Sequence, residues 1–126
     1  MAHGLLRFRL RMPAEIGPWQ KLNPPTIEFV PESPGIFEIG NLVRTVLFIG
    51  RANGNLRQRF EALGAIPENV PASVGGYWVR WVAVDDEESE LAARQTAHRD
   101  QHGGLLPAGN DARSKPVFRL VTRDAA

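Results

Sequence analysis

The sequence predicts the α/β class and, within it, an α+β domain: a small mixed or antiparallel β-sheet flanked by two main helices. Two observations carry this expectation. Short segments rich in β-branched and aromatic residues recur along the chain, and two other segments have the apolar spacing or the acidic start of a helix. The 126 residues, 43% hydrophobic and 23% charged, suffice for one core of ordinary globular composition.

The N-terminal part is expected to be extended. Residues 5–12 alternate leucine, phenylalanine and methionine with arginine, which is typical of a strand with one buried and one basic face. Six prolines within 13–34 exclude a long helix there, although the segment has room for a short strand at 26–30. We therefore divide a single globular unit into a basic strand with a proline-rich connector, 1–32, and a main domain, 33–122.

The main domain is expected to begin with a hairpin and a helix. Residues 34–40 and 43–50 are apolar and β-branched and lie on either side of a turn, which predicts two paired strands. Asn55 is expected to cap a helix over 55–63, because Leu56, Phe60 and Leu63 lie at helical spacing.

A further strand and helix follow. Residues 77–84 form a dense aromatic and β-branched strand, and four acidic residues at 85–88 open a helix that runs to about residue 101. The crossover through the first helix would allow strands 43–50 and 77–84 to pair in parallel. A last strand is expected within 116–122.

Composition excludes several classes of protein. The chain has no cysteine, which rules out a disulfide scaffold, a thiolate zinc site and a cysteine nucleophile. It has no apolar run of membrane-spanning length and no signal-peptide core, so we expect a cytoplasmic protein without a membrane partner. Thirteen of its fifteen basic residues are arginine, which suits phosphate recognition; a GC-rich genome would give the same bias.

Short motifs in a fixed order carry a resemblance. Gly35-Ile36-Phe37 is followed, after ten residues, by Phe48-Ile49-Gly50 and the basic Arg51. Asn55-Leu56-x-x-Arg59 begins the predicted helix, and Pro107-x-x-Asn110 lies near the end of the matching region. Together these motifs, over about residues 33–110, resemble the GIY-YIG nuclease superfamily.

The resemblance implies a phosphodiester-cleaving endonuclease that uses one divalent metal, usually Mg²⁺. In such enzymes a tyrosine of the first motif acts at the attacking water, a second tyrosine supports it, the helix arginine holds the phosphate, and a glutamate on the later helix binds the metal. The family-equivalent catalytic positions here are Phe37, Phe48, Arg51, Arg59 and Asn110.

Three of the catalytic groups are replaced in this sequence. Phenylalanine stands at both tyrosine positions and has no hydroxyl to orient a water. The glutamate position falls on Arg94 when counted from the helix start and on His98 when counted back from Asn110. Glu90, one turn before Arg94, is a weak candidate for a displaced metal ligand, or else forms an ordinary surface pair with it.

The expected function is therefore that of a catalytically degenerate domain. It would bind nucleic acid or another phosphorylated ligand through four arginines and would need no cofactor. One alternative is an active endonuclease with Mg²⁺ held by Glu90, and another is a structural or protein-interaction module. The four phosphate-binding candidates are Arg51, Arg57, Arg59 and Arg94.

Two further clusters admit two interpretations each. The first cluster is Tyr77, Trp78 and Trp81, which interleave with Arg80. These aromatic side chains would suit base stacking in nucleic-acid binding; the alternative is that one face of the strand packs in the core. His98 and His102 are spaced as on a metal-binding helix face, but without a third ligand a solvated helix end is favoured.

Overall fold

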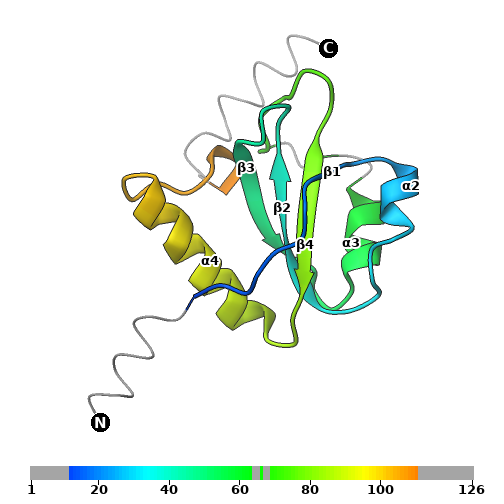
Figure 1. The fold of residues 1–126 in the computed structure, drawn as a ribbon, viewed down its shortest axis with the longest axis horizontal. Helices are drawn as coiled ribbons and strands as arrows, with labels where there is room; N and C mark the ends of the chain where they lie inside the picture. The colour runs from blue at the N-terminus through cyan, green and yellow to red at the C-terminus, as the bar shows by residue number, and fades with distance from the viewer. Residues whose placement is uncertain (1–11, 64–65, 67–68, 111–126) are drawn as a thin grey trace.

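The computed structural model describes residues 12–63, 66 and 69–110 (Figure 1). The predicted strands at 5–12 and 116–122 lie outside these residues. The elements, in chain order, are β1 (Gln20–Lys21), α2 (Pro24–Ile27), β2 (Gly35–Gly40), β3 (Val46–Arg51), α3 (Leu56–Ala62), β4 (Trp78–Ala83), α4 (Glu87–Gln101) and the 3-10 helix η1 (Ala108–Asn110).

The four strands form one sheet in the order β1-β4-β2-β3, and every neighbouring pair is antiparallel. This confirms the predicted α+β class and the hairpin, but the predicted parallel pairing of β3 with β4 is wrong. β2 is buried along all six residues and pairs with β3 on one edge and β4 on the other. The crossover through α3 therefore carries the chain past β2 to its far edge.

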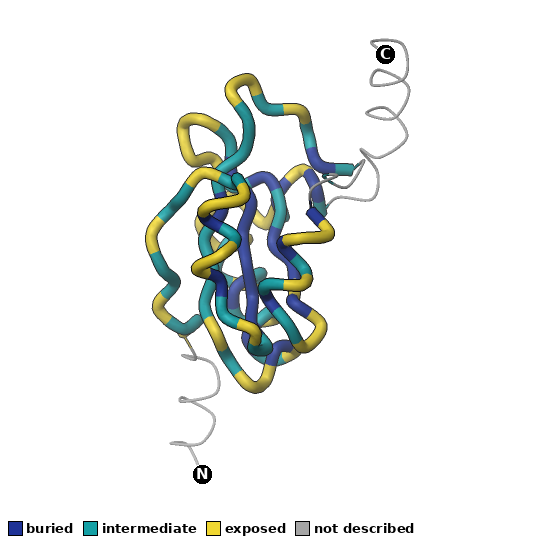
Figure 2. The backbone as a smooth tube through the Cα atoms, turned by 90° about the vertical axis from the view of Figure 1, so that its right-hand side faces the viewer, coloured by how far each residue is buried: buried dark blue, intermediate teal, exposed yellow. Residues whose placement is uncertain are grey.

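Helices cover both faces of this sheet. Figure 1 shows α4 on one side and α3 with α2 on the other. Because side chains alternate along a strand, β2 directs Phe37 and Ile39 toward α3, and Ile36 and Glu38 toward α4. The main apolar cluster lies on the α3 side, and Figure 2 shows buried residues concentrated in the central strands.

The two main helices begin where polar side chains can cap them. The Asn55 side chain accepts a hydrogen bond from the Gln58 amide at 3.0 Å, which confirms the predicted cap of α3. Asp86 does the same for α4, accepting from the Ser89 amide at 3.0 Å. The acidic residues of the first turn of α4 then lie at the positive end of the helix dipole.

The proline-rich connector is hydrogen-bonded to the sheet. It runs along the outer edge of β4, where the Gly17 amide donates to the Trp81 carbonyl at 3.1 Å. The strand expected at 26–30 is wrong, because α2 occupies its start. Asn23 caps α2, and Pro24 supplies the fixed φ that suits a first helical turn.

Candidate functional site

The two aromatic motifs lie on adjacent strands beside α3. The ring centroids of Phe37 on β2 and Phe48 on β3 are 6.0 Å apart. Phe60 of α3 packs edge-on against Phe37 at 5.4 Å. The Arg59 guanidinium carbon lies 5.8 Å from the Phe37 ring centroid, so the arginine and both phenylalanines form one cluster.

Gly50 allows these rings to meet across the hairpin. It lies opposite Phe37 in the β2–β3 ladder. A Cβ atom at this position would lie 2.6 Å from atoms of both the Phe37 and Phe48 rings. The glycine that ends the second motif is thus required by ring packing.

Arg59 differs from the other candidate arginines in its bonding. The Nε atoms of Arg59 and Arg94 are both buried and have no hydrogen-bond partner among the described residues. Arg94 binds two carboxylates through its terminal nitrogens, whereas the described residues provide no carboxylate that pairs with Arg59. The Arg59 side chain is partly exposed, so its guanidinium retains capacity for an anionic ligand.

Arg51 and Arg57 are engaged elsewhere. Arg51 follows Gly50 and therefore projects from the opposite face to Phe37, where it pairs with Glu87 at 3.5 Å. The Arg57 guanidinium donates to the carbonyl of Val30 at 2.8 Å and to that of Glu28 at 3.2 Å. Arg51 and Arg59 thus do not form one shared phosphate clamp, and Arg57 links α3 to the chain that follows α2.

Glu87 of α4 holds together two backbone segments next to this cluster. Its buried carboxylate accepts hydrogen bonds from the amides of Gly35 at 2.9 Å, Gly54 at 3.0 Å and Asn53 at 3.1 Å. Burial by itself would raise the pKa of Glu87, but these amides and Arg51 outweigh it, so the pKa is lowered. The carboxylate joins the start of β2 to the turn that leads into α3.

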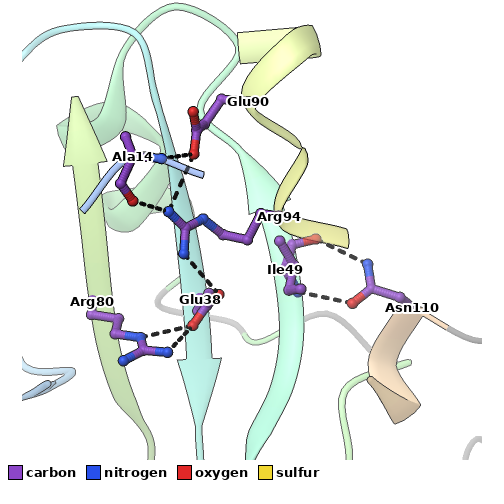
Figure 3. Close-up of polar contacts among 7 residues, drawn as sticks. All are labelled: Ala14, Glu38, Ile49, Arg80, Glu90, Arg94 and Asn110. Atoms are coloured by element: carbon purple, nitrogen blue, oxygen red, sulfur yellow. Dashed lines mark hydrogen bonds and ion pairs between the residues drawn. The ribbon is translucent and has the colours of Figure 1, made fainter. Parts of the chain in front are cut away.

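Arg94 lies in a buried ionic network between α4 and the sheet (Figure 3). Its guanidinium is 3.6 Å from Glu38 and 3.2 Å from Glu90, and it donates to the Ala14 carbonyl. Arg80 pairs with the same Glu38 at 2.7 Å. The expectation that Arg94 faces a phosphate must be corrected, because its side chain is only 8% exposed and is held by two carboxylates.

The residues around Glu90 do not fit a metal centre. One carboxylate oxygen accepts from the Ala14 amide at 2.7 Å and pairs with Arg94, a cation that opposes metal binding. Glu90 forms part of a buried network, so the surface-pair alternative is also wrong. Among the described residues no group of three histidine, aspartate or glutamate side chains could hold a metal ion.

The two positions at which the sequence resemblance would place a metal-binding glutamate do not lie beside the Phe37 cluster. Arg94 contacts Glu38, whose side chain points away from the Phe37 face. At the other counted position, the His98 ring stacks on His102 at 3.9 Å. Burial, followed by the charge of His102, lowers the pKa of His98. Neither position supplies a carboxylate beside Phe37.

Asn110 secures the outer edge of β3. Its side-chain oxygen accepts from the Ile49 amide at 2.8 Å, and its nitrogen donates to the Ile49 carbonyl at 2.9 Å (Figure 3). These two bonds imitate a neighbouring strand, so η1 is fixed against an edge that would otherwise be open. Within the described structure, the Asn110 side chain therefore has a structural role, because it binds the backbone of Ile49.

The aromatic strand β4 divides between two faces. Val79 is fully buried, and Trp81 packs edge-on against Phe60 at 5.5 Å. Trp78 and Arg80 share the opposite face. The core interpretation is therefore confirmed for Val79 and Trp81, whereas Trp78 remains partly exposed.

Comparison with known proteins gives no match: no family model, no curated protein and no solved structure resembles this chain significantly. Within the described part of the chain, no helix combines the length and the apolar character needed to cross a bilayer.

Proposed function

We propose that this chain is a cytoplasmic GIY-YIG-like domain that binds nucleic acid or another phosphorylated ligand and does not cleave it. The observation that carries the proposal is Arg59, a partly exposed guanidinium beside Phe37. Of the four candidate arginines, it is the one that the described residues leave without a carboxylate or carbonyl partner.

Phosphate is the ligand that suits this group. A guanidinium presents planar, paired donors that match two phosphate oxygens, and its charge persists at any physiological pH. The Phe37 ring beneath Arg59 limits solvation on one side, which strengthens an ion pair on the other. Phosphate binding would therefore give the partly exposed Arg59 guanidinium a partner that the described residues do not provide.

The residues around Arg59 favour binding over turnover. Phe37 and Phe48 have no group that can accept a proton from water. Glu90 is held by Ala14 and Arg94 on the other side of the sheet. We therefore derive no catalytic step at this site.

Fluorescence anisotropy with labelled single-stranded and duplex oligonucleotides of about 20 nucleotides tests binding, over salt concentrations from about 50 to about 200 mM. Arg59→Gln should weaken binding and reduce the slope of log affinity against log salt by about 0.9 on duplex, the value for one phosphate contact. Arg99→Gln, an exposed arginine on α4, is the charge-matched control. Equal losses in the two variants, or no binding by the wild type, would contradict the proposal.

A nicking assay with Mg²⁺ and Mn²⁺ on plasmid DNA tests the second half of the proposal. We expect no cleavage above background. Cleavage that Arg59→Gln and Glu90→Ala both abolish would instead support a metal-dependent endonuclease. Because Glu90 is buried, each variant must first show a cooperative unfolding transition.

A further inference from the structure

A cluster of cations surrounds a tryptophan at one end of the sheet. The Lys21 ammonium of β1 lies 5.3 Å from the ring centroid of Trp78 on β4. The Arg44 guanidinium, from the loop between β2 and β3, lies 4.6 Å from the same ring. In the β2–β4 ladder Trp78 lies opposite Gly40. The Trp19 indole packs directly against Gly40. We call Lys21, Arg44 and Trp78 the cationic platform.

The backbone holds Arg44 in place at a conformational cost. Arg44 has a φ of 66°, a left-handed conformation that favours glycine or asparagine. The loop is fixed by Asn41, whose side-chain oxygen accepts from the amides of Val43 at 3.1 Å and Thr45 at 2.9 Å. A hairpin loop would ordinarily place glycine at such a position, whereas this loop carries an arginine directed to Trp78.

The electrostatics of this end favour an anion. The loops 41–45 and 71–77 contain no acidic residue, and within the described structure neither Lys21 nor Arg44 pairs with a carboxylate. The acidic residues 85–88 follow the far end of β4. Charge is therefore separated along the sheet, with the platform at the positive end.

The same two loops also offer apolar surface. Val43 is 76% exposed and Val74 is 91% exposed. Between the loops lies a hollow of about 220 Å³, lined in part by these valines and by Ser73. A ligand with flat apolar faces would complement this lining.

We propose that the cationic platform binds single-stranded nucleic acid. Lys21 would contact phosphates, as would the Arg44 donors that do not bind the Leu42 carbonyl. The Arg44 guanidinium over Trp78 would also present a flat face to an unpaired base. A duplex hides its base faces and would contact the platform through phosphates alone. This inference extends the proposed function, since the ligand is nucleic acid, but it rests on residues other than Arg59.

An anionic membrane is the competing partner for a surface of cations and exposed valines. The platform favours nucleic acid because its centre is a tryptophan with a guanidinium over its ring, an arrangement suited to base stacking. Membrane-docking surfaces instead require a larger continuous apolar face. Vesicle sedimentation therefore belongs in the test.

The decisive variant is Arg44→Gly, which removes the side chain and relieves the left-handed backbone. It should unfold at a temperature no lower than that of the wild type. Its affinity for a labelled oligothymidylate of about 12 nucleotides should fall about fivefold or more, the lower end of what a stacking contact contributes. Affinity for a duplex of equal length should fall less, because the duplex loses a phosphate contact but no base stacking.

Three results would overturn the inference. One is an Arg44→Gly protein that binds oligothymidylate as well as Arg99→Gln does. Another is an equal loss of affinity on single strand and duplex. The third is sedimentation with phosphatidylserine vesicles, lost in Arg44→Gly, without any oligonucleotide binding. Arg59→Gln is measured in parallel, so a loss with Arg44→Gly alone would sustain the platform and contradict the proposed role of Arg59.

Discussion

Replacing Glu87 with glutamine is predicted to destabilise the fold by about 2–3 kcal/mol. The carboxylate is 7% exposed and accepts three backbone hydrogen bonds, each charge-assisted. Glutamine keeps one oxygen but turns an NH₂ group toward an amide donor, so at least one bond is lost and a buried N–H is left unpaired. Glu88→Gln, an exposed neighbour in the same helical turn, is the control and should cost less than about 0.5 kcal/mol.

The loss of stability in Glu87→Gln should also depend on pH. Because the folded state lowers the pKa of Glu87 below its usual 4.5, the ionised carboxylate stabilises the fold above that value. That stability is lost as the pH falls through the folded-state pKa. Urea denaturation should therefore show a gap between wild type and Glu87→Gln that is constant above about pH 5 and narrows below it. A gap no larger than that of Glu88→Gln, or one that does not change with pH, would refute the assigned role.

Three further changes test other parts of the structure. Asn110→Ala should speed hydrogen exchange of the Ile49 amide, which loses its acceptor at the edge of β3; unchanged exchange would contradict the edge role. Gly50→Ala should cost about 1–3 kcal/mol in urea denaturation because its methyl group meets the Phe37 ring, and a neutral effect would show that the rings can move. Arg94→Met should cost about 3–5 kcal/mol in urea denaturation at neutral pH, because it removes the buried cation that Glu38 and Glu90 share and leaves Glu38 with Arg80. A cost below about 1 kcal/mol would contradict this.

Much of the fold follows from local sequence. The hairpin strands, the Asn55 cap and the acidic start of α4 are set by residues close together in the chain, and each was predictable. Strand order was not predictable in this way, because it depends on which strand pairs with a neighbour on both of its edges. α2 was missed because the many prolines near it favour extended chain, whereas Asn23 followed by Pro24 is in fact a helix start.

The site was predictable only in part. The predicted hairpin and helix account for the meeting of Phe37 and Phe48 beside α3, where Arg59 lies next to the Phe37 ring. The motif positions could not show that Arg94 faces away from that cluster, since the facing of a helix depends on its packing. The roles of Glu87 and Arg44 were also missed. A clue to Glu87 was its place among the acidic residues that begin α4, but nothing local revealed its three backbone partners.

The most direct test of the proposed function is to observe the Arg59 side chain during ligand binding. Arginine Nε–H groups give resolved signals in nitrogen–proton correlation spectra, and the buried Nε of Arg59 should exchange slowly enough to be seen. Its signal is assigned by its disappearance in Arg59→Lys. Titration with an oligonucleotide should shift this signal in step with the affinity measured by anisotropy. The Nε–H of Arg94, which is also buried without a partner among the described residues but lies on the other side of the sheet, should stay unchanged. A saturated complex in which the Arg59 signal has not moved would contradict phosphate binding at this site.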